Sequence, residues 1–181
     1  MTDRRYPDAA AGPFPEPPID WTDEAGREIA IRVCQGDRES LVAMYDDFDP
    51  AERAQGIPPV GESAIRDWLD HLLCADCYNV VATHDGEIIG HATLVGDGEG
   101  GYELAIFVHQ GYQDAGIGTQ LLEALLGHAA ADGVERVWLT VERWNKPATY
   151  LYQKVGFEST GAEDFEREMS IRLAQPDAPT G

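Results

Sequence analysis

The chain has 181 residues, enough for one domain of about 150 residues with a buried core, and its 43% hydrophobic content with four Trp, seven Tyr and five Phe excludes a largely disordered protein. Asp and Glu number 33 against 13 Lys and Arg, a formal net charge of −20, which disfavours nucleic-acid binding because no basic patch is available for phosphates. No apolar run approaches the ~18 residues of a membrane span, and no apolar segment follows the arginine pair near the N-terminus, so we expect no membrane contact, no secretory signal and a cytoplasmic location.

The first predicted element is an arm. Residues 1–24 contain five prolines and little periodicity, which predicts an extended or disordered segment. The next stretch, EIAIRVCQ (28–35), alternates between apolar and polar residues as a strand does. We therefore place one domain over residues 25–174, after the proline-rich arm, and a short tail over 175–181.

Two helices are predicted next. GDRESLVAMYDDF (36–48) starts a helix for which Asp37 is a plausible N-cap. ESAIRDWLDHLLC (62–74) is a second helix with Ser63 as a possible cap. The apolar face of this second helix comprises Ile65, Trp68, Leu69, Leu72 and Leu73.

The segment YNVVATHDGEIIGHATLVGD (78–97) predicts a hairpin, because two apolar runs are separated by Asp85-Gly86, a type I′ turn dipeptide. The remaining predicted elements are a strand over 101–109, a helix over 117–133, a strand over 134–142, a helix over 146–156, and strands that start at residues 157 and 165. The order strand, turn, helix, strand over 102–142 fits a right-handed parallel crossover. An α/β fold with a mixed sheet and helices on both faces is expected.

The three cysteines raise the question of a metal or a disulfide. Cys34, Cys74 and Cys77 are an odd number in a chain without a signal, which argues against a disulfide framework. His71, Cys74 and Cys77 have a spacing that could supply three zinc ligands, but no fourth ligand stands at a recognised spacing. We expect no metal and a packing role for the cysteines.

The glycine-rich turn HQGYQDAGIG before the 117–133 helix is typical of a phosphate site. Ile117 and Gly118 stand where a P-loop needs Lys and Ser or Thr, and Leu121 fills the third glycine position of a dinucleotide fingerprint. What remains is Q-x-x-G-x-G over 113–118, whose glycines let the backbone approach an anion at a helix start. A tight strand-to-helix turn with no ligand would explain the same residues.

These segments resemble the GNAT family of N-acetyltransferases. The resemblance rests on YELAIFV, then QDAGIG, then VWLTVE, then Asn145-x-x-Ala148-x-x-Leu151-Tyr152-x-x-x-Gly156-Phe157, in the expected order and elements. It implies a GNAT-type fold with a central mixed sheet of six to seven strands. It also implies transfer of the acetyl group of acetyl-CoA to a primary amine of a metabolite, peptide or protein, by direct attack on the thioester in a ternary complex.

The resemblance assigns residues to the donor. Backbone N–H groups of the glycine turn would hold the diphosphate of CoA. The strand before the turn would bind the pantetheine arm in a gap between two splayed parallel strands. A bulge in that strand could aim one N–H at the thioester oxygen. Asn145 matches a position that meets the cofactor. The implied cofactor-binding residues are Ile106, Phe107, Val108, Gln113, Asp114, Ala115, Gly116, Ile117, Gly118, Thr119, Asn145 and Tyr152.

The chemistry needs a base and an acid. A lysine-like amine is only about one part in a thousand neutral near pH 7, so a base or a water chain must remove its proton. Glu103 lies where many family members have such a glutamate, and Tyr152 matches the tyrosine that protonates the departing thiolate. His109 is a second candidate base, with His91 and Glu142 weaker. Each of these side chains also has a purely structural interpretation, as a packed tyrosine or a solvated acid.

The acceptor is not identified by the sequence. Trp68 and Trp144 could line an acceptor site, although buried ring packing is the expected role for both. A non-catalytic acyl-CoA-binding or sensing module and a phosphate-binding protein of another class remain alternatives, and the oligomeric state is open. The evenly spread acidic residues resemble those of proteins from halophilic archaea, in which salt screens self-repulsion.

Overall fold

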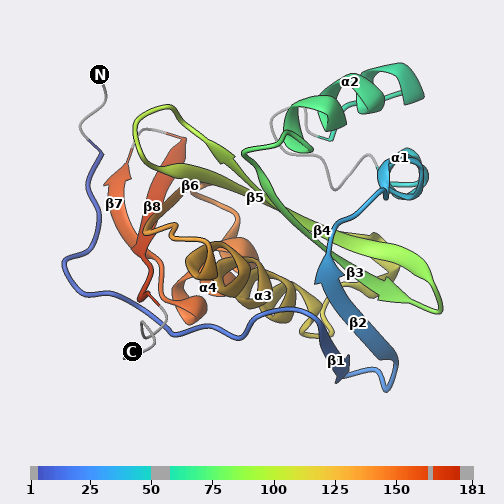
Figure 1. Ribbon diagram of the computed structural model, residues 1–181, viewed down its shortest axis with the longest axis horizontal. Coiled ribbons are helices and arrows are strands. Elements are labelled where there is room, and N and C mark those ends of the chain that lie inside the picture. Colours follow the sequence, from blue (N-terminus) through green and yellow to red (C-terminus); the bar gives the residue numbers. More distant parts are fainter. Residues whose placement is uncertain (1–3, 50–57, 163–164, 176–181) are drawn as a thin grey trace.

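The computed structural model describes residues 4–49, 58–162 and 165–175. Its elements in chain order are β1 (Ile19–Thr22), β2 (Glu28–Val33), α1 (Arg38–Asp46), α2 (Glu62–Leu72), β3 (Tyr78–His84), β4 (Glu87–Gly96), β5 (Tyr102–Val108), the 3-10 turn η2 (Gln110–Tyr112), α3 (Ile117–Ala131), β6 (Arg136–Glu142), α4 (Lys146–Val155), β7 (Glu158–Ala162) and β8 (Glu166–Arg172). The strands form one eight-stranded sheet in the order β1-β2-β3-β4-β5-β6-β8-β7 (Figure 1). In the described residues, no helix is both long and apolar enough to cross a membrane.

The predicted α/β fold is confirmed, with one parallel strand pair in an otherwise antiparallel sheet. β5 and β6 run parallel and are connected by α3, as the crossover pattern predicted. The sheet has eight strands rather than six to seven. The additional edge strand is β1, which lies in the predicted N-terminal arm and pairs antiparallel with β2. Prolines on its N-terminal side obscured the short alternation of Ile19 to Thr22.

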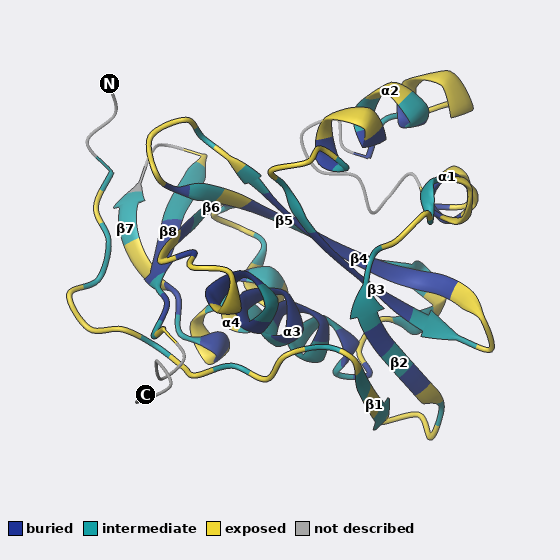
Figure 2. Ribbon diagram, in the orientation of Figure 1, coloured by how far each residue is buried: buried dark blue, intermediate teal, exposed yellow. Residues whose placement is uncertain are grey.

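Helices cover both faces of the sheet, and each face has its own core. α3 and α4 lie on one face and α1 and α2 on the other (Figure 1). The larger core joins α3 to apolar residues of the sheet such as Leu104 and Val137, and the smaller joins α1 and α2 to Val81 and Ile88. Dark, buried segments therefore follow the strands and the inner side of α3, while the outer sides of α1 and α2 are exposed (Figure 2). Alternation along β5 points Leu104 to the larger core and Phe107 to the smaller one.

The predicted hairpin is confirmed in detail. β3 and β4 are joined by the two residues Asp85 and Gly86, whose φ angles of 51° and 83° are both positive, as a type I′ turn requires. Of the two predicted helix caps, one is confirmed in position. Asp37 is the N-cap residue of α1, and its carbonyl accepts from the N–H of Leu41, but its side chain makes no capping bond; the carboxylate instead accepts two hydrogen bonds from Arg32. α2 begins at Glu62 after Gly61, so Ser63 lies inside the helix and is not its cap.

The cysteines also correct the sequence interpretation. Cys74 and Cys77 form a disulfide in the turn between α2 and β3, where their Cα atoms lie 5.1 Å apart, while Cys34 is a free thiol. The packing role expected for all three is therefore wrong for this pair. The disulfide depends on where α2 ends, because the turn after the helix brings the two residues together. The number of cysteines does not predict where that helix ends. Within the described ranges no three His, Cys, Asp or Glu side chains converge as metal ligands.

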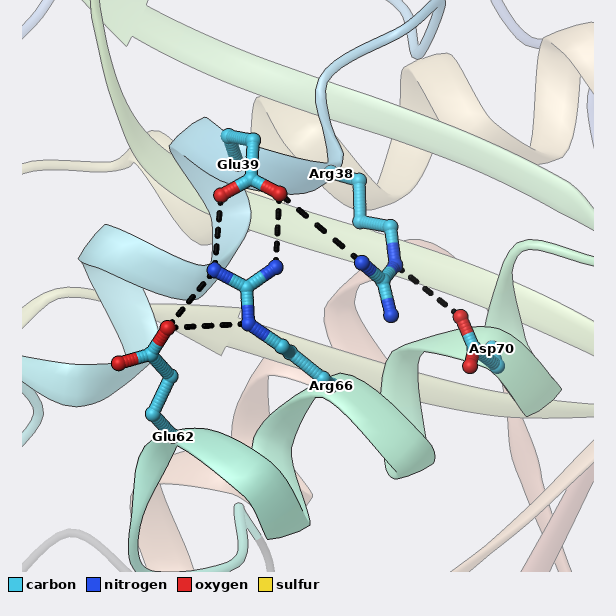
Figure 3. A network of polar contacts seen from close by, with 5 residues as sticks. All are labelled: Arg38, Glu39, Glu62, Arg66 and Asp70. Carbon is cyan, nitrogen blue, oxygen red and sulfur yellow. Dashed lines mark hydrogen bonds and ion pairs between the residues drawn. The ribbon is translucent and has the colours of Figure 1, made fainter.

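An exposed ion-pair network joins α1 to α2 (Figure 3). Arg66 of α2 binds Glu39 of α1 through two bonds of 2.7 and 2.8 Å, and also binds Glu62 one turn earlier. Arg38 of α1 binds Asp70 of α2 at 3.0 Å. The network fixes two helices that the sequence connects through residues 47–61. Because these pairs face water, each is worth at most about 1 kcal/mol.

Candidate functional site

A cleft of about 430 Å³ opens where β5 and β6 separate. The parallel register joins Tyr102 to Val137 and Glu103 to Trp138, and pairing goes no further along β5 in the described chain. The cleft is lined from Glu103 to Val108 on β5, by the 112–118 turn, by Thr140 to Glu142 on β6 and by the first turns of α4. β5 therefore presents a backbone edge without ladder partners to a partly apolar cavity, which suits an extended ligand with amide groups.

The bulge that was expected in β5 is absent. β4 pairs with β5 in one unbroken register from Gly90–Val108 to Gly96–Tyr102. The irregularity in this region is in the pairing of β3 with β4, where Ala82 and Thr83 lie opposite Gly90 and Ile88, so that Ile89 of β4 is the extra residue. Alternation along β5 is therefore preserved, and Glu103, Phe107 and His109 face the α1 and α2 side together.

The glycine turn closes one end of the cleft. Asp114 and Gly116 both have positive φ, 59° and 86°, and α3 begins at Ile117 without a side-chain cap. The N–H groups of the first turn of such a helix have no partner within the helix and attract an anion. Gln113 donates a hydrogen bond from Nε2 to the carbonyl of Val108 at 3.1 Å, which ties the turn to β5.

Most of the predicted cofactor-binding residues meet in this cleft. Its lining includes Ile106, Phe107, Val108, Gln113, Asp114, Gly116, Ile117, Gly118, Asn145 and Tyr152. Two of the predicted residues do not line it: Ala115 is buried in the larger core, and Thr119 lies further into α3. The carbonyl of Ala115 instead accepts a hydrogen bond from the N–H of Glu24.

The β1–β2 hairpin supports the glycine turn from outside, which the sequence did not predict. Arg27 donates to the carbonyl of Gly111 at 3.0 Å, and its guanidinium lies 4.3 Å from the centroid of the Tyr112 ring. The Trp21 ring lies 3.1 Å from the position that a Cβ on Gly116 would take. These contacts fix the conformation of the turn. They connect residues more than 80 positions apart, so no local pattern signals them.

α4 places Tyr152 on the wall opposite β5. The helix is capped by Asn145, whose Oδ1 accepts from the N–H of Ala148 at 3.3 Å, and Pro147 stands in its first turn, a favourable position. The Tyr152 ring packs edge-on against Phe157 at 5.8 Å between centroids. Burial raises the pKa of the Tyr152 hydroxyl to about 12, so the group is protonated, and available as a proton donor, at any physiological pH.

Glu103 lies at the other end of the cleft, at the last point where β5 and β6 are paired. The Glu103 residue is exposed, but desolvation of its carboxyl by the surrounding side chains raises the pKa, and the charge of Asp97 raises it further, whereas the Arg4 guanidinium lowers it. A carboxylate with a raised pKa is a stronger base than a free one, which suits removal of a proton from an ammonium group.

The histidines proposed as alternative bases make hydrogen bonds within the fold through both ring nitrogens. His109 binds the carboxylate of Asp47 through Nε2 at 2.8 Å and accepts from the N–H of Gly111 through Nδ1. His91 is fully buried between Tyr45 and Asn79, 2.6 and 2.7 Å away, and burial lowers its pKa to about 3. Neither lines the cleft, while Glu142, also a weaker candidate, does.

The two tryptophans that could line an acceptor site differ in their burial. Trp68 packs edge-on against Tyr45 and Phe107, with centroids 5.0 and 5.4 Å away, which agrees with the expected ring packing. Trp144 is 62% exposed, so the expectation of burial is wrong for it. It lies in the loop between β6 and α4, next to a residue of the cleft, and the N–H of Arg143 in this loop bonds the carbonyl of Phe165.

Several lining residues were not predicted. They are Leu104, Ala105, Tyr112, Thr140, Val141, Pro147, Ala148 and Leu151. Thr140 and Val141 follow from the splayed parallel pair, since its second strand must form the far wall. Ala148 precedes Tyr152 by one helical turn, Leu151 lies three residues after Ala148, and Pro147 is next to Ala148, so helical spacing could have identified these residues.

The chain belongs to the acetyltransferase (GNAT) family, whose family model matches residues 39–157. It is 30% identical over 134 residues to an L-methionine sulfoximine/L-methionine sulfone acetyltransferase of Pseudomonas aeruginosa, a match that covers 69% of this chain and 77% of the relative. It is 36% identical over 87 residues to an uncharacterised N-acetyltransferase of Mycobacterium tuberculosis, covering 48% of this chain. This second match spans 56% of the relative, about half of its length.

Solved structures share the fold. The GNAT domain of Streptomyces lividans PAT superposes with a TM-score of 0.71 at 20% identity, over 86% of this chain and 96% of that one. A protein from Salmonella typhimurium, solved with its cofactor acetyl-CoA, superposes with a TM-score of 0.65 at 20% identity, over 83% and 97% of the two chains. At this identity the likeness concerns the fold.

Proposed function

We propose that the protein is an acetyl-CoA-dependent N-acetyltransferase that acetylates a primary amine of a metabolite, peptide or protein within a ternary complex. The observation that carries the proposal is the cleft between β5 and β6, which ends in an uncapped helix start at Gly116 and has Tyr152 and Glu103 on its walls. Membership of the family supports the same reaction.

The residues present fit the donor. The helix start at Ile117 and Gly118 would hold the diphosphate through backbone N–H groups, and no lysine is needed. The edge of β5 from Ile106 to Val108, apart from the Val108 carbonyl that Gln113 occupies, would hydrogen-bond the amides of the pantetheine arm, as an added strand does. When bound, acetyl-CoA supplies an acetyl group activated as a thioester.

Glu103 and Tyr152 divide the proton transfers. Glu103 takes a proton from the acceptor ammonium, directly or through water, so that the amine can attack. Tyr152 keeps its own proton to high pH and gives it to the departing sulfur, which would otherwise leave as a thiolate. His91 and His109 are less suited because both ring nitrogens of each are hydrogen-bonded within the fold.

The acceptor amine is to be found by a panel of candidates. The Pseudomonas relative is named for L-methionine sulfoximine and L-methionine sulfone, so small amino-acid-like amines belong in the first panel, beside polyamines and lysine peptides. The acidic surface is compatible with cationic acceptors, but acids that are spread along the chain without a long run favour adaptation to salt. We therefore also propose that the protein works at high ionic strength, as in a halophile.

The test is incubation with acetyl-CoA and the amine panel in molar KCl, with release of the CoA thiol followed by a thiol reagent. Release that depends on an amine supports the proposed reaction. Calorimetric binding of CoA without turnover on any amine would favour the alternative, a non-catalytic acyl-CoA-binding module. No binding of CoA at all would exclude both.

A further inference from the structure

The N-terminal arm, which precedes the segment matched by the family model, places a cation beside the site. Arg4 donates from Nε to Oε1 of Glu168 at 3.0 Å, and its Cζ atom lies 3.3 Å from the centroid of the Trp138 ring. Only 14% of the Arg4 side chain is exposed. The guanidinium is thus fixed on two sides, unlike that of a mobile surface arginine.

Trp138 is also the neighbour of Glu103. The two residues are paired across β5 and β6, so their side chains project from the same face of the sheet. The indole N–H of Trp138 donates to Asp97 at 3.0 Å, and Asp97 also accepts backbone N–H groups of the loop before β5. Arg4, Trp138, Asp97 and Glu103 therefore form one group at the end of the cleft.

The arm is held in this place by contacts on both sides of Arg4. Ser170 of β8 donates to the carbonyl of Arg5 at 2.8 Å, and Arg172 donates to that of Pro7 at 2.9 Å. The Tyr6 hydroxyl packs against Gly101, immediately before β5, where a Cβ would meet it at 2.4 Å. The position of Arg4 is thus set by β8 and by the start of β5.

We propose that Arg4 is a positioning residue of the acetyl-transfer site: its guanidinium, stacked on the Trp138 ring, holds a positive charge near Glu103, the strand neighbour of Trp138. This inference rests on the role of Glu103 in the proposed function. Burial and Asp97 raise the pKa of Glu103, and Arg4 opposes them. The other titratable or charged side chains around this group are Tyr6, Arg136, Glu142 and Glu168. Without Arg4, burial and the charge of Asp97 act on Glu103 with no cation to oppose them. The carboxyl then stays protonated to higher pH, and a protonated carboxyl cannot accept the proton of an ammonium group.

The experiment compares Arg4→Met with Arg5→Met through the pH dependence of kcat/KM for thiol release. Both variants remove one positive charge, but the Arg5 side chain is exposed, so Arg5→Met controls for net charge. We expect Arg4→Met to move the acid side of the pH profile, where kcat/KM falls as Glu103 is protonated, to higher pH. On that side of the profile kcat/KM should be about three- to tenfold below that of Arg5→Met, and at high pH the two variants should be equal. Arg4→Lys, which keeps the charge, should restore most of the difference.

Two outcomes would overturn the inference. Profiles of Arg4→Met and Arg5→Met that coincide at all pH values would show that Arg4 does not act on the base, and a uniform loss without a shifted limb would show a merely structural role. In the Glu103→Gln background, Arg4→Met should cause no additional shift. A wild-type protein that binds CoA but releases no thiol at any pH would instead refute the proposed function, and this inference with it.

Discussion

The hydroxyl of Tyr45 lies 2.6 Å from Nδ1 of His91, in a fully buried contact between α1 and β4. His91 Nε2 is 2.7 Å from the side-chain oxygen of Asn79, and the Asn79 amide donates to the carbonyl of Leu72. The Asn79 orientation makes its oxygen an acceptor, so Nε2 carries the proton and Nδ1 accepts from Tyr45. The chain of bonds joins α1, β4, β3 and the end of α2 through neutral groups.

The first prediction concerns this chain and pH. Because the folded-state pKa of His91, about 3, lies below the unfolded value of about 6.5, the unfolded state binds a proton first as the pH falls. Stability from neutral His91 is therefore complete above about pH 6.5 and falls by about 1.4 kcal/mol per pH unit below it. His91→Gln should cost about 1–3 kcal/mol at pH 7.5, and its deficit should shrink toward pH 5.5 in urea unfolding. The exposed His71→Gln is the control, and a deficit that does not change with pH contradicts the prediction.

The second prediction concerns the general acid. Tyr152→Phe should slow CoA thiol release by about ten- to a thousandfold and leave the Kd for CoA within about threefold, because the ring that lines the cleft is kept. Tyr150, two residues earlier, is 68% exposed, so Tyr150→Phe should behave as wild type. Stopped-flow thiol detection and calorimetry measure the two quantities. An unchanged rate in Tyr152→Phe would remove this hydroxyl from the mechanism.

The third prediction concerns the turn before α3. Gly116→Ala combines a left-handed backbone, at about 1–2 kcal/mol, with a Cβ that would lie 3.1 Å from the Trp21 ring. We expect the Kd for CoA to rise by about tenfold or more. Gly98 has a similar φ of 79° but nothing within 4 Å, so Gly98→Ala should show strain in its stability without loss of CoA affinity. Equal affinities for the two variants would mean that the diphosphate does not bind at this turn.

The fourth prediction concerns the packing of the N-terminal arm against α3. A Cβ on Gly127 would lie 2.1 Å from the carbonyl oxygen of Pro15. Helix propensity alone would make Gly127→Ala stabilising by about 1 kcal/mol, whereas the clash should destabilise by about 1–3 kcal/mol. Gly118→Ala in the same helix meets its nearest atom at 3.5 Å and serves as the stability control. A higher Tm for Gly127→Ala would show that the arm does not pack there.

The fifth prediction concerns salt. At a net charge of −20, self-repulsion is screened over about 3 Å in 1 M salt but over about 30 Å at 0.01 M. Far-UV circular dichroism should therefore show loss of structure in dilute buffer and recovery in molar KCl. Sucrose, which stabilises without screening charge, should restore less at equal osmolality. Full structure in dilute buffer would refute adaptation to salt.

Local patterns predicted the elements that carry the site, and longer-range contacts account for what they missed. Periodicity located β5, α3 and α4, and the positive φ at Gly116 follows from the same turn. β1 was missed because four residues directly after a proline-rich segment carry a weak signal, and its pairing with β2 is a tertiary contact. The engagement of His109 by Asp47, 62 positions earlier, and the pairing of Cys74 with Cys77 likewise depend on where helices end in space.

The arm imposes an order on the assembly of the molecule. Arg4 binds Glu168, which lies 164 positions later in the sequence. The N–H of Ala11 donates to the carbonyl of Arg172, and the carbonyl of Ala11 accepts from the N–H of Ala174. The ribosome synthesises the arm long before β8. The arm therefore cannot form these contacts until β8, the last strand in the chain, has left the ribosome. Contacts of such separation form late and slowly. A nascent chain could thus already contain the glycine turn and α4, yet lack the charge beside Glu103 until synthesis has passed β8.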